Sequence, residues 1–193
     1  MGLNMWRLEN GQDLVETWAY IPNALTKDQC EKIIQLGESL LPETASTFGG
    51  VCPDIRTSKV SWIQPSSNSE WLFRHMTDIV MGLNSKFFKF DLDGFAEGLQ
   101  FTKYEAPAGK YEAHIDKAYG ASIRKLSVVL QLSDTADYEG GELCIQIGET
   151  PQPMKKEQGF LVAFPSYVLH GVQPVTKGTR YSLVAWITGP AFK

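Results

Sequence analysis

The segment GFLVAFPSYVLHGVQPVTKGTRYSLVAWIT, residues 159–188, contains three short runs that are rich in β-branched and aromatic residues. Turn residues separate these runs, namely Pro165-Ser166 and Lys177-Gly178. Runs this short, bounded by turn residues, are typical of β-strands rather than of helices. The segment therefore predicts three consecutive strands, at residues 159–164, 168–175 and 179–188.

The same pattern extends back toward the middle of the chain. Four further strands are expected at residues 99–104, 111–115, 125–132 and 142–147. Seven short strands at this spacing, with no helix among them, indicate an antiparallel sandwich or jelly roll rather than a sheet that alternates with helices.

The first half of the chain carries the helical signals. Thr26-Lys27-Asp28-Gln29 fits a capping box, and apolar residues follow it at helical spacing. A second helix is expected to start near Ser67 and to reach Phe88. Residues 43–54, between the two helices, are expected to form a mobile loop, and a short strand is expected at residues 59–63. The sequence thus predicts a mainly β protein of the α+β class, with two helices packed on one face of its core.

Composition limits the function classes. The 193 residues suit one domain, with helical support in residues 1–93 and the β core in residues 94–190. A net charge of −4, with no basic block, argues against a nucleic-acid partner. The three scattered cysteines fit no zinc spacing and are expected to be reduced. Because the N-terminal stretch lacks an apolar signal region and no run is long enough to cross a membrane, we expect a cytoplasmic protein without a membrane partner.

The stretch YEAHIDKAYG, residues 111–120, holds the first candidate metal ligands. His114 and Asp116 lie two positions apart in an expected strand and therefore project to the same face, whereas Ile115 is expected to point into apolar packing. With His170 as a distant third ligand, they form a 2-His-1-carboxylate set, which suits non-haem Fe(II) and leaves coordination positions open. Taken alone, a His-x-Asp pair also fits a surface site or a hydrogen-bonded core histidine.

A second signal lies in the last expected strand. Arg180 and Ser182 share one face of it, where a guanidinium and a hydroxyl can together bind a carboxylate. An arginine on the ligand-bearing side of a buried strand needs an anion. The alternative is that Arg180 pairs with an acidic residue at the rim.

These residues carry a resemblance. Residues 99–188 resemble an iron(II)/2-oxoglutarate-dependent dioxygenase of the prolyl 4-hydroxylase-like family, whose core is a double-stranded β-helix, or jelly roll. That family has a tyrosine ten residues before a His-x-Asp pair, a distal histidine and a basic residue about ten residues later. The pattern is met by Tyr104, His114, Asp116, His170 and Arg180. The segments GGEL, LHGVQPV, GTRYSLVAWI and, upstream, DIRTSKVSWI are also similar to the family.

The resemblance implies a role for each residue. His114, Asp116 and His170 would bind Fe(II), which 2-oxoglutarate would chelate through its keto and C1 carboxylate oxygens. Arg180 would bind the far C5 carboxylate. Tyr104, Ser182 and Trp186 would complete that pocket.

Two positions depart from the commonest family pattern. Collagen-type members commonly carry lysine at the basic position, whereas Arg180 followed by Trp186 looks more like the oxygen-sensing prolyl hydroxylases. Gln131 stands where relatives often have a tyrosine that faces the cosubstrate. Gln131 is therefore a candidate contact to 2-oxoglutarate, although an amide that is satisfied within the sheet fits the sequence equally well.

The activity implied by the resemblance is O₂-dependent hydroxylation of an unactivated C–H bond, with succinate and CO₂ as coproducts. The implied substrate is a proline in a peptide or protein, covered by the Gly49-Gly50 loop and the 111–124 region. A free amino acid or another small molecule, a non-catalytic jelly-roll binding module and a zinc hydrolase remain alternatives. Asp116 argues against a halogenase, in which a halide replaces that carboxylate. The sequence leaves the oligomeric state open.

Overall fold

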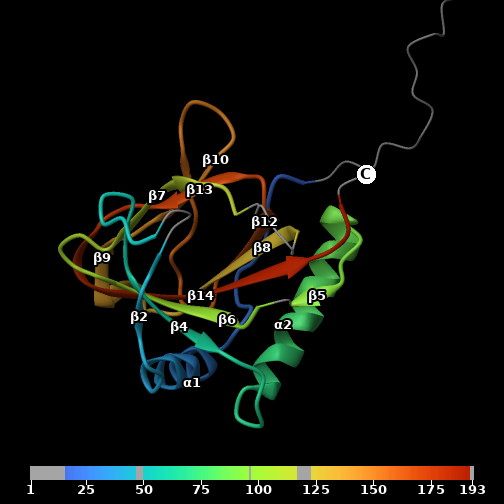
Figure 1. Ribbon diagram of the computed structural model, residues 1–193, viewed down its shortest axis with the longest axis horizontal. Coiled ribbons are helices and arrows are strands. Elements are labelled where there is room, and N and C mark those ends of the chain that lie inside the picture. Colours follow the sequence, from blue (N-terminus) through green and yellow to red (C-terminus); the bar gives the residue numbers. More distant parts are fainter. Residues whose placement is uncertain (1–15, 47–49, 96, 117–122, 192–193) are drawn as a thin grey trace, which may run out of the picture.

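The computed structural model describes residues 16–46, 50–95, 97–116 and 123–191 (Figure 1). Its helices are α1 (Lys27–Glu38) and α2 (Glu70–Leu83), with a π-helical turn η1 (Asn84–Phe88) and a 3-10 turn η2 (Thr135–Asp137). The strands are β1 (Ala19–Ile21), β2 (Glu43–Thr44), β3 (Arg56–Thr57), β4 (Lys59–Ile63), β5 (Gly94–Phe95), β6 (Leu99–Glu105), β7 (Lys110–His114), β8 (Arg124–Gln131), β9 (Tyr138–Gly140), β10 (Leu143–Gln146), β11 (Gln152–Pro153), β12 (Leu161–Pro165), β13 (Leu169–Val172) and β14 (Val175–Thr188).

The strands form two antiparallel sheets. The first has the order β1-β12-β8-β14-β6-β4-β2, and the second has the order β11-β10-β13-β7-β3. Figure 1 shows α1 and α2 on the side of the first sheet that faces away from β7, β10 and β13. This arrangement confirms the predicted fold class, a jelly roll with helices on one face.

Alternation along the strands separates two apolar cores. On β14, Leu183, Ala185 and Ile187 point to the core that the first sheet shares with α1 and α2. A second core, which includes Val129 and Phe164, lies between the two sheets. The intervening residues of β14 therefore face the interior of the jelly roll, where side chains from both sheets meet.

The predicted elements match the observed ones closely where the sequence pattern is long. The capping box at Thr26 is present, with Thr26 Oγ1 accepting from the Gln29 N–H and Gln29 Oε1 accepting from the Thr26 N–H. The second helix begins at Glu70 rather than near Ser67, and the strand predicted at residues 59–63 is β4.

Two expectations need correction. β7 ends at His114, so Ile115 lies beyond the strand with 42% of its surface exposed instead of packing in the core. The expected loop at residues 43–54 begins with β2, which pairs with β4. Residues 47–49 of that loop and residues 117–122 of the other proposed lid lie outside the described residues.

Among the described residues, no helix combines the length and the apolar character required to cross a membrane. The three cysteines, Cys30, Cys52 and Cys144, are free.

Candidate active site

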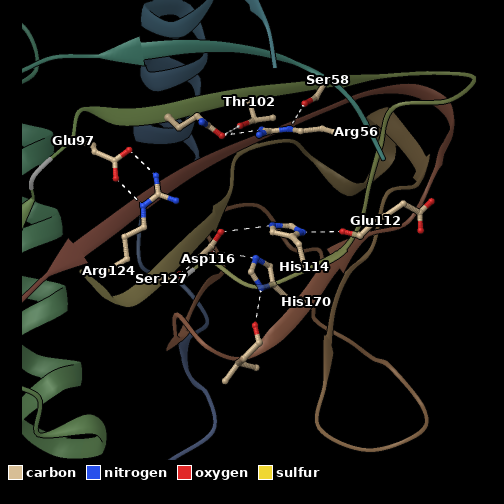
Figure 2. A network of polar contacts seen from close by, with 12 residues as sticks. Arg56, Ser58, Glu97, Thr102, Glu112, His114, Asp116, Arg124, Ser127 and His170 are labelled. Carbon is tan, nitrogen blue, oxygen red and sulfur yellow. Dashed lines mark hydrogen bonds and ion pairs between the residues drawn. The ribbon is translucent and has the colours of Figure 1, made fainter. Parts of the chain in front are cut away.

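Three candidate metal ligands meet at one end of the second sheet. His114 is the last residue of β7, Asp116 follows two residues later, and His170 lies in β13 directly opposite His114 in the antiparallel pairing. His114 Nε2 lies 3.6 Å from Asp116 Oδ1, and His170 Nε2 lies 3.4 Å from Asp116 Oδ2. Figure 2 shows the three side chains pointing toward one another. Their ligand atoms all lie within 4.8 Å of one another, as a shared cation requires.

Backbone carbonyls fix the orientation of both imidazoles. His114 Nδ1 lies 2.8 Å from the Glu112 carbonyl oxygen, and His170 Nδ1 lies 3.0 Å from that of Val168. A carbonyl oxygen only accepts, so each Nδ1 carries the hydrogen and each Nε2 faces the cluster. This is the usual second contact of a metal-binding histidine.

Asp116 is held on two sides. Its backbone N–H donates to the Ser166 carbonyl oxygen at 2.9 Å, and Ser127 Oγ donates to Asp116 Oδ2 at 2.7 Å. Ser127 is fully buried on β8, in the first sheet. Its hydroxyl therefore reaches across the jelly roll to orient the Asp116 carboxylate, which follows β7 of the second sheet.

The protonation states suit a cation. Burial lowers the pKa of His114 below its ordinary value. Burial also acts to raise the pKa of Asp116, but the positive charge of His170 and the contacts of both imidazoles with the carboxylate outweigh it, so the pKa of Asp116 lies well below its usual range. Burial acts to lower the pKa of His170, but the negative charge of the Asp116 carboxylate outweighs burial, so the pKa of His170 is raised. A divalent cation bound by the three residues would displace the proton on His170, and Asp116 would already be ionised to bind it.

Arg180 is the most deeply buried charged side chain that lines the cleft. Only 1% of its surface is exposed, and it lines the same cleft as the three candidate ligands. Its Nη2 donates to Gln131 Oε1 at 2.8 Å, and its guanidinium lies 5.1 Å from the centre of the Tyr104 ring. No carboxylate pairs with Arg180 among the described residues, and its Nε and Nη1 atoms have no hydrogen-bond partner there. A buried guanidinium in this state has free donors for an anion.

The remaining predicted residues surround Arg180. Tyr104, Ser182 and Trp186 line the cleft together with the metal cluster. Gln131 does not line the cleft; it lies behind Arg180, from which its Oε1 accepts a hydrogen bond. The Gln131 Nε2 has no hydrogen-bond partner in the described part of the chain. The donor set therefore fits both a metal and a cosubstrate carboxylate.

Known proteins share this sequence pattern. Residues 99–188 match the model of the 2OG-Fe(II) oxygenase superfamily. A PKHD-type hydroxylase of Prochlorococcus marinus is 32% identical over 161 residues, which cover 82% of this chain and 71% of that protein. The chain belongs to the 2OG-Fe(II) oxygenase superfamily. It is accordingly a 2-oxoglutarate-dependent dioxygenase, with Fe(II), 2-oxoglutarate and O₂ as its cofactor and cosubstrates.

Solved structures of oxygenases share the fold. A prolyl-4-hydroxylase of Pseudomonas putida superposes with a TM-score of 0.73 and 22% identity, over 91% of this chain and 94% of that chain. A prolyl hydroxylase from Trichoplax adhaerens, in complex with a hypoxia inducible factor oxygen degradation domain peptide fragment, superposes with a TM-score of 0.77 and 19% identity, over 90% of this chain and 84% of that chain. This oxygenase thus has the same jelly-roll architecture.

Sequence reasoning missed one arginine that lines the oxygenase cleft, Arg56, and one that packs on its wall, Arg124. Arg56, in the two-residue strand β3, donates to Ser58 Oγ and to Gln100 Oε1 at 2.9 Å each and lies 4.5 Å from the centre of the Tyr111 ring. Arg124 lies 3.9 Å from the Trp186 ring. Figure 2 shows its guanidinium paired with Glu97. The sequence signal that could have pointed to Arg56 was the family-like segment DIRTSKVSWI, which contains it. The pairing of β3 with β7, which the sequence does not reveal, brings Arg56 to the site.

Proposed function

We propose that this oxygenase hydroxylates a proline residue within a peptide or protein, as one catalytic domain in which the first 93 residues support the jelly-roll core. The observation that carries the proposal is the shared cleft, in which a three-ligand cluster lies together with an arginine that has no counter-ion in the described part of the chain. The name of the PKHD-type relative supports hydroxylation, and the names of the two prolyl hydroxylase structures support proline as the target.

In this proposal, His114, Asp116 and His170 hold Fe(II), and Arg180 binds the far carboxylate of 2-oxoglutarate. Bound together, iron and 2-oxoglutarate activate O₂ for insertion of one oxygen atom into a C–H bond, with release of succinate and CO₂. The contribution of the chain is geometry: the Glu112 and Val168 carbonyls keep both imidazoles in one tautomer.

The far-carboxylate pocket has further proposed members. Tyr104 places its ring against the Arg180 guanidinium, and Ser182 offers a buried hydroxyl on the same face of β14. Gln131 orients Arg180 by accepting from Nη2, and Trp186 closes the wall of the cleft. Because Arg180 and Ser182 are almost fully buried, bulk water does not compete with the bound carboxylate.

Exposed apolar side chains next to the ligands support a peptide substrate. Ile115 lies between two of the candidate ligands, and Tyr167 follows Ser166, whose carbonyl accepts from the Asp116 N–H. Ile55 is exposed on the neighbouring segment, where its carbonyl accepts from the Glu112 N–H. Exposed apolar side chains in the segments that carry the ligands suit the flanking residues of a bound peptide.

One observation favours a second candidate, a free amino acid or another small acid. Arg56 is buried in the cleft and, among the described residues, bonds only neutral side chains, so it retains charge for a substrate carboxylate. Arg124, by contrast, is paired with Glu97 through two hydrogen bonds of 2.8 and 2.7 Å.

A substrate panel separates these candidates. The Fe(II)-loaded protein is incubated with 2-oxoglutarate, O₂ and either proline-containing peptides or free proline, and succinate and the mass of each substrate are measured. We expect a peptide to gain one oxygen atom in step with succinate formation. Oxidation of free proline alone would replace the peptide proposal, and succinate formation with no substrate in the panel would leave a binding module as the better description.

Ser127→Ala tests the support of Asp116. We expect Fe(II) affinity to fall by roughly 10- to 100-fold, since removal of an outer-shell partner typically has this effect on a metal site. Anaerobic Fe(II) titration measures the change. Ser85→Ala is the matched control because Ser85 is exposed and bonds only the Gly82 carbonyl, among the described contacts. Wild-type affinity in Ser127→Ala would show that the hydroxyl does not orient the ligand.

A further inference from the structure

A tyrosine that sequence analysis overlooked lies beside Arg180. Tyr138 is the first residue of β9, which pairs with β14 so that Tyr138 stands opposite Gly178. Only 3% of its surface is exposed, and its hydroxyl has no hydrogen-bond partner among the described residues. Burial raises the pKa of Tyr138, and the positive charge of Arg180 is the strongest influence that opposes this shift. The phenol is therefore neutral and close enough to Arg180 to respond to its charge.

Packing fixes the position of this ring relative to Arg180. A Cβ atom at Gly141 would lie 3.0 Å from Arg180 Cδ and 3.4 Å from Tyr138 Cε2, so the side chains of Arg180 and Tyr138 both lie beside Gly141. Gly141 also has a φ of +67°, which favours glycine. Lys156 Nζ lies 4.3 Å from the centre of the Tyr138 ring and donates to the Gly140 carbonyl oxygen at 2.7 Å. The ring is thus held from several directions, and its hydroxyl has a defined place.

The groups that orient Arg180 are all neutral. Gln131 accepts one hydrogen bond from the guanidinium, the Tyr104 ring faces it, and Tyr138 adds a hydroxyl. A carboxylate in any of these places would neutralise Arg180 and compete with an incoming anion. A phenol can accept from an N–H of Arg180 without removing its charge.

We propose that Tyr138 is a positioning residue for Arg180, which holds the guanidinium in the orientation that selects a 2-oxo acid with a second carboxylate. This inference rests on the proposed function, because it assigns to Arg180 the far carboxylate of 2-oxoglutarate. Tyr138 does not line the cleft itself, so it acts through Arg180.

The test compares two ligands of equal chain length. Anaerobic Fe(II)-loaded protein is titrated with 2-oxoglutarate and with 2-oxopentanoate, which lacks the second carboxylate, and binding is followed by calorimetry. In Tyr138→Phe we expect affinity for 2-oxoglutarate to fall about tenfold, since the guanidinium loses the dipole of the neighbouring phenol hydroxyl. Affinity for 2-oxopentanoate stays unchanged, a difference that a general loss of packing would not produce.

Two further variants complete the experiment. Tyr20→Phe is the matched control, because Tyr20 is 53% exposed on β1, and it should bind both ligands like the wild type. In an Arg180→Ala background, Tyr138→Phe should cause no additional loss, because its effect passes through Arg180. Wild-type affinity for 2-oxoglutarate in Tyr138→Phe, or an equal loss for both ligands, overturns the proposal for Tyr138 alone. A wild-type protein that binds both ligands equally overturns the role of Arg180, and the proposal for Tyr138 with it.

Discussion

Asp116→Ala is expected to abolish turnover and to weaken Fe(II) binding severely while the protein stays folded. Asp116 supplies the one anionic ligand of the cluster, with both imidazole Nε2 atoms within 3.6 Å of its oxygens. Without it, two neutral imidazoles remain, and we expect Fe(II) affinity to fall by roughly a thousandfold or more, equivalent to about 4 kcal/mol. Anaerobic Fe(II) titration and succinate formation measure the two losses.

The fold survives because Asp116 lies beyond the end of β7 and belongs to neither apolar core. Thermal unfolding checks this. Asp134→Ala is a suitable control, since Asp134 is an acid of the surface that pairs with Lys27 and should not affect iron. An Asp116→Ala protein with wild-type turnover would show that the metal site lies elsewhere.

Arg180→Ala is expected to weaken 2-oxoglutarate binding by roughly 100-fold or more, because loss of one member of a buried charge pair costs about 2–5 kcal/mol. Fe(II) binding should stay near the wild-type level, since none of the candidate ligands bonds Arg180. Arg180→Lys keeps the charge but loses the planar fork, so it should lie between the alanine variant and the wild type. Equal 2-oxoglutarate affinity in wild type and Arg180→Ala would remove Arg180 from the cosubstrate pocket.

Gln131→Glu tests the same pocket by adding a negative charge beside Arg180, with almost no change in side-chain shape. The new carboxylate stands where Gln131 Oε1 lies 2.8 Å from Arg180 Nη2, so it supplies an internal counter-ion. We expect 2-oxoglutarate affinity to fall by at least roughly tenfold, with no loss of thermal stability in the ligand-free protein. Calorimetry and thermal unfolding together check this, and tighter 2-oxoglutarate binding in Gln131→Glu would contradict it.

Long, regular patterns were the predictable part of the fold. β4 matches its predicted residues, and β6 extends the predicted strand by one residue, because alternating or continuous apolar runs of this length leave few other structures open. The strands β2, β3 and β11 have two residues each and carry no periodicity. Each of these strands forms because a neighbouring strand offers backbone groups for hydrogen bonding. A local sequence pattern carries no information about that neighbour.

The same distinction applies to the site. His114, Asp116, His170 and Arg180 were named from their spacing, and the structure brings all four to one cleft. Tyr138 depends instead on the pairing of β9 with β14, and no spacing rule connects it to Arg180. Ile115 was misplaced because the strand rule was applied one residue beyond the end of β7.

In its proposed role, Arg180, for which the described residues supply no counter-ion, would also link cosubstrate supply to the lifetime of the folded chain. A guanidinium buried without an anion opposes folding, and a ligand that fills the pocket favours the native state by RT ln(1 + [L]/Kd). At a hundredfold excess over Kd this amounts to about 2.7 kcal/mol, enough to change the unfolded fraction about a hundredfold. When 2-oxoglutarate is scarce, the unfolded population and its exposure to proteases rise, so the abundance of the protein would follow the metabolite that it consumes.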